Sequence, residues 1–100
     1  MDIYQATNNF PREEAFWLTS QLRRAAVSVA SNIVEGCVRI TAAEYIQFLT
    51  IAYASAREAE YQISLAERLG FLEQSQFTLL QNPSVETCKV INGLIRSLRK

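Results

Sequence analysis

Apolar positions recur every three or four residues along most of this chain, which is the helical period, and no segment alternates as a half-buried strand does. Glycine, proline and capping residues divide the sequence into a stub at 3–7 and longer helices at 11–35, 41–69 and 84–98. A short helix is also predicted at 73–81. The pattern therefore predicts an all-α protein of three long helices and an N-terminal stub.

Local signals predict where these helices begin and end. Pro11 suits the first position of a helix. Gly36 suits the left-handed residue that follows a helix, and Gly70 ends the next one. Thr41 and Glu44 form a capping box, in which the threonine accepts a bond from the amide three residues on and the glutamate reaches back.

The last periodic stretch carries two residues that disfavour a helix. The pair Asn82-Pro83 either breaks the helix before it or restarts one, with Asn82 as the cap and Pro83 as the first residue. Gly93 costs about 1 kcal/mol relative to alanine inside a helix, so we expect close packing around it.

The helix at 11–35 has two apolar stripes where a surface helix needs one. The first stripe comprises Leu18, Leu22, Ala25, Ala26, Val29 and Ile33, and the second comprises Phe16, Val27 and Val34. We expect the first to pack inside the domain and the second to pack against another molecule, which predicts a homo-oligomer.

The helix at 41–69 has a seam with the four-three spacing of left-handed bundles. Its members are Tyr45, Leu49, Ala52, Ala56, Ala59, Ile63 and Ala66. Ile46, Phe48, Ile51 and Tyr53 make the first half apolar almost all round, and we expect that half to be the most buried part of the fold.

Composition narrows the classes of function. One hundred residues are the size of one domain (residues 1–100), and the zero net charge argues against a protein that coats nucleic acid by bulk charge. We expect no secretory signal, no membrane span and a cytoplasmic protein. Cys37 and Cys88 are expected to be reduced thiols, although a disulfide is conceivable.

The chain contains no histidine, which removes Ser-His-Asp and Cys-His catalysis. No metal, phosphate-loop or paired-carboxylate motif is present either. We therefore expect no enzyme, no catalytic residues, no metal site and no cofactor.

Two adjacent arginines have different predicted settings. Arg24 lies on the polar arc and is either solvated or a contact for a phosphate or an acidic partner. Arg23 is flanked by apolar residues, and burying an unpaired guanidinium is costly. We expect Arg23 to form a structural ion pair, with Glu60 as the first candidate and Glu58 as the second, within the bundle or across a subunit interface. The alternatives are that Arg23 contacts a ligand or that its side chain snorkels toward solvent.

Two further groups are weaker candidates. Asn32, Glu35 and Arg39 cluster near the predicted turn, as a bracing network or as part of a functional patch. A basic tail, which comprises Arg96, Arg99 and Lys100, favours a helix C-terminus and is a candidate contact for nucleic acid or another anionic partner.

Several motifs resemble a known family. They are Phe10-Pro11-x-Glu13, Gln21-Leu22-Arg23-Arg24-Ala25-Ala26-Val27-Ser28-Val29, Ser31-Asn32-Ile33-x-Glu35-Gly36-x-x-Arg39, Glu44-Tyr45-x-x-Phe48-Leu49-x-Ile51-Ala52, Leu69-Gly70-Phe71-Leu72 and Asn92-Gly93-Leu94-Ile95-Arg96-Ser97-Leu98. Together they resemble the four-helix-bundle family of 23S ribosomal RNA intervening-sequence proteins. Its central motif falls here on Arg23, Arg24, Asn32, Glu35, Gly36 and Arg39.

The resemblance implies an antiparallel up-and-down four-helix bundle that forms a ring-like homopentamer. The family's first helix is long, and only its last turns appear here, at 3–7, so we expect either a truncated bundle or a chain that was cut or started internally. It also implies kinship to the accessory variability protein of diversity-generating retroelements, which binds a reverse transcriptase and nucleic acid. The family has no established enzymatic activity. The sequence departs from the family pattern at Ala30, where proline is usual, at Ala54, where glycine is usual, and at Cys37-Val38.

These observations predict a non-enzymatic, homo-oligomeric accessory protein. Its partners are further copies of itself, with a pentamer favoured, and RNA or a nucleic-acid-processing protein. The alternative is a purely structural oligomer that interacts with protein and has no nucleic-acid role.

Overall fold

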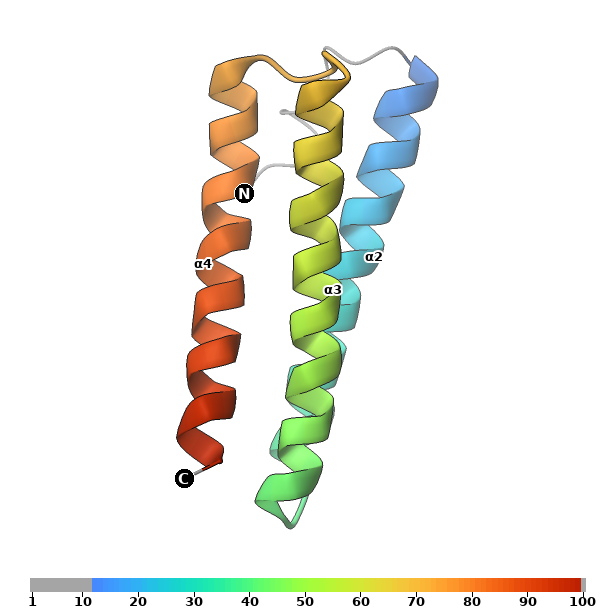
Figure 1. Cartoon of the computed structure of the whole chain (residues 1–100). Coiled ribbons are helices and arrows are strands. Elements are labelled where there is room, and N and C mark those ends of the chain that lie inside the picture. The colour runs from blue at the N-terminus through green and yellow to red at the C-terminus, as the bar shows by residue number, and fades with distance from the viewer. Residues whose placement is uncertain (1–11, 100) are drawn as a thin grey trace.

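A computed structural model describes residues 12–99, apart from the side chains of residues 12, 14 and 15. It contains helices α2 (Arg12–Cys37), α3 (Ala42–Arg68) and α4 (Gln74–Leu98). They run up and down in antiparallel order, with α3 between the other two (Figure 1). The all-α prediction is confirmed for these residues. The predicted stub lies outside the described residues, so a four-helix bundle is not shown.

Helix α3 has the predicted signals at both ends. Thr41 Oγ1 accepts a hydrogen bond from the Glu44 amide at 3.2 Å, and its hydroxyl donates to Glu44 Oε1 at 3.1 Å. After Leu69, Gly70 takes a φ of 80°, and the Phe71 amide donates to the Ala66 carbonyl at 2.9 Å. The turn therefore uses the left-handed conformation that favours glycine and satisfies carbonyls of the last turn.

Gly36 has a different role from the one predicted. Helix α2 continues through it to Cys37, and Gly70 is the residue with positive φ in the described part of the chain. Gly36 is buried where α2 meets α3, and a Cβ built there would lie 2.6 Å from Tyr45 Cδ1 and 3.1 Å from Phe48 Cβ. The glycine is required by close approach, so the left-handed prediction is wrong.

Helix α4 runs unbroken through Asn82-Pro83, so both predicted interruptions are wrong. Proline removes one helical hydrogen bond, to the carbonyl four residues earlier. The continuous buried face of the helix, which includes Leu80 and Cys88 on either side of Pro83, outweighs that loss. Gly93 has no atom within 4 Å of an added Cβ, so the predicted close packing around it is also wrong in the single chain.

Two buried clusters hold the helices together. Near the α3–α4 turn, all three helices contribute to a cluster of Leu18, Leu22, Ile63, Ala66, Leu72 and Leu80. Toward the other end, buried residues come from α3 and α4 alone: Leu49, Ala52, Ala56, Cys88, Ile91 and Ile95. There α2 adds half-buried Val29 and Ile33. The backbones of α2 and α4 do not approach each other along the described helices, so the bundle is open on that side.

The predicted α3 seam is confirmed, because its members line these clusters. The first half of α3 is not the most buried part of the fold, however, since Ile51 is 50% exposed. Of the residues that make this half apolar all round, Ile46 and Tyr53 are half-buried against the second cluster, whereas Ile51 faces solvent.

The two helical glycines predict opposite effects of the same substitution. Gly36→Ala places a methyl against the Tyr45 ring and the Phe48 Cβ, and overpacking of this kind costs about 1–3 kcal/mol. Gly93→Ala enters open space and should raise the free energy of unfolding by up to about 1 kcal/mol. Denaturant unfolding followed by circular dichroism measures both, and a neutral Gly36→Ala would contradict the steric argument.

Candidate functional site

On the side where α2 and α4 do not approach each other, residues 12–99 form an apolar groove of about 340 Å³. We call it the α2 groove; it is lined by Leu22, Ala25, Ala26, Val29, Ala30, Ile33, Ala56, Ala59, Pro83, Ser84 and Thr87. It exists because α4 packs on α3 and leaves the first apolar stripe of α2 half-covered. The five alanines in its wall allow another backbone to come close.

The two hydroxyls of the α2 groove have no free proton to donate to a ligand, because both already donate within α4. Ser84 Oγ donates to the Leu80 carbonyl at 3.1 Å, and Thr87 Oγ1 donates to the Pro83 carbonyl at 2.9 Å. Each hydroxyl proton is thus used within its own helix. The surface is suited to an apolar helix face.

The second stripe of α2 is exposed, as predicted for a single chain. Phe16 is 75% exposed, and Val27 and Val34 are each 64% exposed. At about 100° per residue the centre of this stripe lies roughly a third of a turn from the centre of the α2 groove on the same helix. Helix α2 therefore presents two neighbouring apolar surfaces, and contiguous exposure of this kind usually marks an association site.

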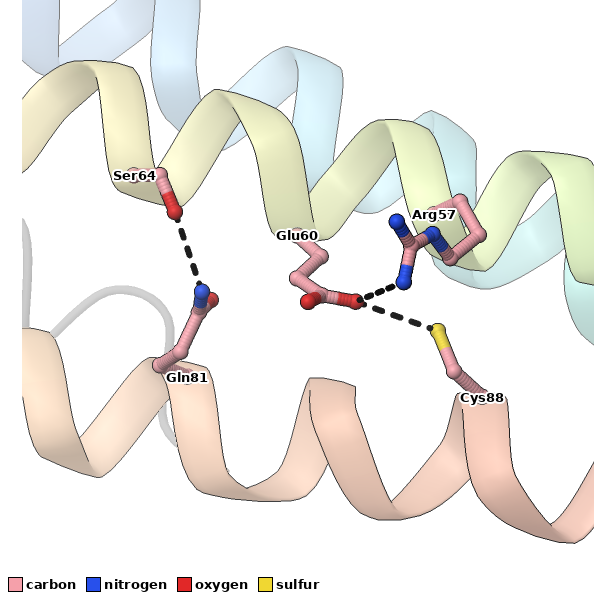
Figure 2. Close-up of polar contacts among 5 residues, drawn as sticks. All are labelled: Arg57, Glu60, Ser64, Gln81 and Cys88. Atoms are coloured by element: carbon pink, nitrogen blue, oxygen red, sulfur yellow. Dashed lines mark hydrogen bonds and ion pairs between the residues drawn. The ribbon is translucent and has the colours of Figure 1, made fainter.

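The predicted partners Arg23 and Glu60 occupy different surroundings. Arg23 is exposed on α2. Glu60 lies at the α3–α4 interface, where its Oε2 is 3.6 Å from Arg57 Nη1 and accepts a hydrogen bond from Cys88 Sγ at 3.5 Å (Figure 2). These are the Glu60 contacts within residues 12–99. A pairing of Arg23 across a subunit interface stays a prediction.

Cys88 is a buried free thiol and Cys37 an exposed one, as expected for reduced cysteines. Burial raises the pKa of the Cys88 thiol above its ordinary value of 9.0, and the hydrogen bond to Glu60 raises it further. Both effects disfavour the thiolate. Cys88 is therefore a packing residue that closes the interface, with its proton held by Glu60.

The α2–α3 turn brings together part of the predicted cluster. Arg39 Nη2 donates to Glu35 Oε2 at 2.9 Å, and its guanidinium lies 4.6 Å from the centre of the Phe48 ring. Asn32 instead donates to the Ser28 carbonyl at 2.7 Å, one turn back along α2. The bracing interpretation therefore fits Glu35 and Arg39, and Asn32 belongs to another contact.

The candidate basic residues separate into two places. The α2–α3 turn and the C-terminal end of α4 lie at the same end of the molecule, so Arg39, Arg96 and Arg99 share that end (Figure 1). Arg24 lies about 20 Å further along α2. Lys100 lies outside the described residues.

Two features of the surface were not apparent from the sequence. The polar contacts Gln21–Gln62 and Ser28–Ser55 join α2 to α3. Their seven-residue spacing on both helices was a signal, but it requires the antiparallel register. The α2 groove could not be predicted from the pattern of any single helix, because its lining comes from all three.

The geometry defines an antiparallel all-helical protein with an open apolar groove beside an exposed apolar stripe. Within residues 12–99, no helix is both long enough and apolar enough to cross a membrane. The chain belongs to the 23S rRNA-intervening sequence protein family, because the sequence model of that family matches residues 1–93.

A solved structure supports the fold. The chain is similar to a protein of unknown function from the S23 ribosomal protein family of Bacteroides thetaiotaomicron, known from a crystal structure at 1.70 Å resolution. The two are 23% identical, the TM-score is 0.72, and the match covers 94% of this chain and 98% of the other. At this identity the likeness shows the fold alone. No curated protein matches the chain.

The two cysteines predict distinct reactivities with a thiol reagent such as dithionitrobenzoate. Exposed Cys37 should react fast and buried Cys88 slowly at pH 8. Glu60→Gln should speed the reaction of Cys88, because it removes the carboxylate that raises the thiol pKa, whereas exposed Glu58→Gln should not.

The same pKa shift has a consequence for stability. Because the folded-state pKa of Cys88 is raised, the neutral thiol stabilises the fold below the ordinary value of 9.0, and this contribution is lost as the pH rises through the folded-state pKa. Unfolding midpoints measured across this range should fall more steeply for the wild type than for Cys88→Ser. Equal slopes would argue against the assignment.

Proposed function

We propose that this chain is a non-enzymatic helical protein that assembles with further copies of itself through α2. The observation that carries the proposal is the α2 groove, whose walls are apolar and whose two hydroxyls are already bonded within α4. The exposed stripe of α2 supplies a complementary apolar surface of valine and phenylalanine. An assembly that buries the α2 groove and the stripe removes their apolar area from water, which is favourable.

The groove and the stripe are different surfaces of one molecule. A contact that seats the stripe of one copy in the groove of the next is heterologous, and such contacts form a closed ring when the rotation between copies closes. This supports the ring-like pentamer that the family resemblance implies, and five copies are our first expectation.

Arg23 lies between the two apolar stripes on the helix surface, flanked by Phe16, Val27 and Ala30. In the proposed contact Arg23 is near the interface, where a carboxylate of a neighbouring copy would add to the contact.

The proposal predicts an assembly larger than the 11.3 kDa chain. Sedimentation velocity at micromolar concentration should show an oligomer for the wild type, and Val27→Glu or Ala26→Glu should dissociate it, because each places an unpaired charge in the contact. Val90→Glu, which changes an exposed valine on α4, is the matched control and should leave the mass unchanged. A wild-type monomer would refute self-association; a stable dimer or tetramer would refute only the stoichiometry.

A second candidate function is RNA binding at the end that Arg39, Arg96 and Arg99 share (Figure 1). These residues are distant in sequence, and the fold brings them to one end. Glu35 offsets part of this charge, because it pairs with Arg39. The arrangement favours a few phosphate contacts in a chain of zero net charge.

RNA binding would fall steeply with salt, because each phosphate contact releases counterions. Fluorescence anisotropy with a single-stranded RNA should give a log–log salt slope that Arg96→Ala and Arg99→Ala each reduce by about one. Arg68→Ala, at the opposite end of the bundle, is the control and should leave the slope unchanged. No binding at low salt would favour the purely structural oligomer.

A further inference from the structure

A second cavity, of about 240 Å³, lies between α2 and α3, and α4 contributes no lining residue to it. We call it the polar cavity. Its lining comprises Gln21, Arg24, Ser28, Ser55, Glu58 and Gln62, together with Ala25. The α2–α3 pair is thus apolar on the side of the groove and polar here, and no part of the proposed self-association uses the polar cavity.

Two polar contacts between α2 and α3 frame the cavity. Ser28 Oγ and Ser55 Oγ are 2.7 Å apart, and Gln62 Nε2 donates to Gln21 Oε1 at 3.5 Å. Seven residues separate the two contacts along each helix, which corresponds to about 10 Å. Between them α2 contributes the methyl group of Ala25 and the exposed side chain of Arg24, and the small size of Ala25 leaves the space of the cavity.

Gln62 is the most informative group in the lining. The residue is 8% exposed, and its Oε1 is buried with no hydrogen-bond partner in the described structure. A buried carbonyl oxygen without a donor is unfavourable. The contact with Gln21 is long, so the amide is weakly held and is able to turn toward a donor in the cavity.

The charged residues that line the cavity limit which ligands can supply a donor to Gln62. Arg24 and Glu58 are both exposed, and neither forms an ion pair within residues 12–99. A simple anion would be repelled by Glu58, and a simple cation would be repelled by Arg24. A molecule that carries both charges satisfies both residues.

We infer that the polar cavity binds a small zwitterion, a free α-amino acid. Its carboxylate pairs with Arg24, and its ammonium group donates to Glu58 and to Gln62 Oε1. The cavity is smaller than the roughly 300–1,000 Å³ of pockets that hold drug-sized ligands, so the ligand is small. The lining contains no aromatic ring, which favours an amino acid with a small or polar side chain.

The experiment screens the standard amino acids against the wild-type chain by saturation-transfer NMR and measures the strongest by calorimetry. We expect at least one to bind with a Kd of about 1 mM or tighter. Its N-acetyl derivative and its methyl ester should not bind, because each lacks one of the two charges.

Variants connect binding to the cavity. Arg24→Gln and Glu58→Gln should each weaken binding by about tenfold or more, because charge-assisted hydrogen bonds are lost. Gln62→Met should weaken it without unfolding the chain, which circular dichroism checks. Arg68→Gln and Glu86→Gln, both exposed and outside the cavity, are the matched controls.

Two results would overturn the inference. One is that no amino acid binds, which means that water alone fills the cavity. The other is that the best amino acid binds equally well to Arg24→Gln and Glu58→Gln, which places it elsewhere. Neither result bears on the oligomer, whose test concerns mass and the opposite side of the α2–α3 pair.

Discussion

Both outer helices pack on the alanine-rich seam of α3, and the rest of the structure depends on this shared contact. Ala52, Ala56 and Ala66 are buried together with the large side chains of Leu49 and Ile63. Small side chains allow neighbouring backbones to approach closely, while the two large ones supply most of the apolar area. Because α2 and α4 contact α3 and their backbones do not approach each other, the three described helices meet at one end and leave α2 and α4 apart along most of their length.

That opening gives the α2–α3 pair two different surfaces. One side is the α2 groove, where alanines, valine and isoleucine leave apolar area to be covered. The other side is the polar cavity, where amides, hydroxyls and two opposite charges meet. Ala25 lines both, so a single small residue separates an apolar surface from a polar one. A larger side chain there would fill space on both sides.

The positions of the charged side chains reflect the free-energy cost of burying a charge. Glu60, a half-buried carboxylate between α3 and α4, is held by Arg57 of its own helix and by the thiol of Cys88. Arg23 and Arg24 remain at the surface of the single chain, where charges stay hydrated. Within residues 12–99 no side chain covers the exposed apolar residues beside Arg23, and this supports the self-association that we propose.

The sequence by itself determined the all-α class, helix α3 and the family of the chain. Helical periodicity, the Thr41 cap and Gly70 act within a few residues, so they predicted α3 and both of its ends. The seam of α3 and the exposed stripe of α2 follow from period and composition, and they too were predictable. Local chemistry was enough wherever the deciding contacts lie within one or two helical turns.

Tertiary structure decided what depends on contacts between helices. Pro83 lies inside a helix because the buried face of α4 outweighs one lost hydrogen bond, and Gly36 is required by the ring of Tyr45. The partners of Glu60 and the polar contacts between α2 and α3 depend on antiparallel register, which no single helix specifies. The α2 groove depends on where α4 packs. The apolar stripe of α2 shows that this face tends to be buried, but the sequence alone does not show which element, if any, covers it.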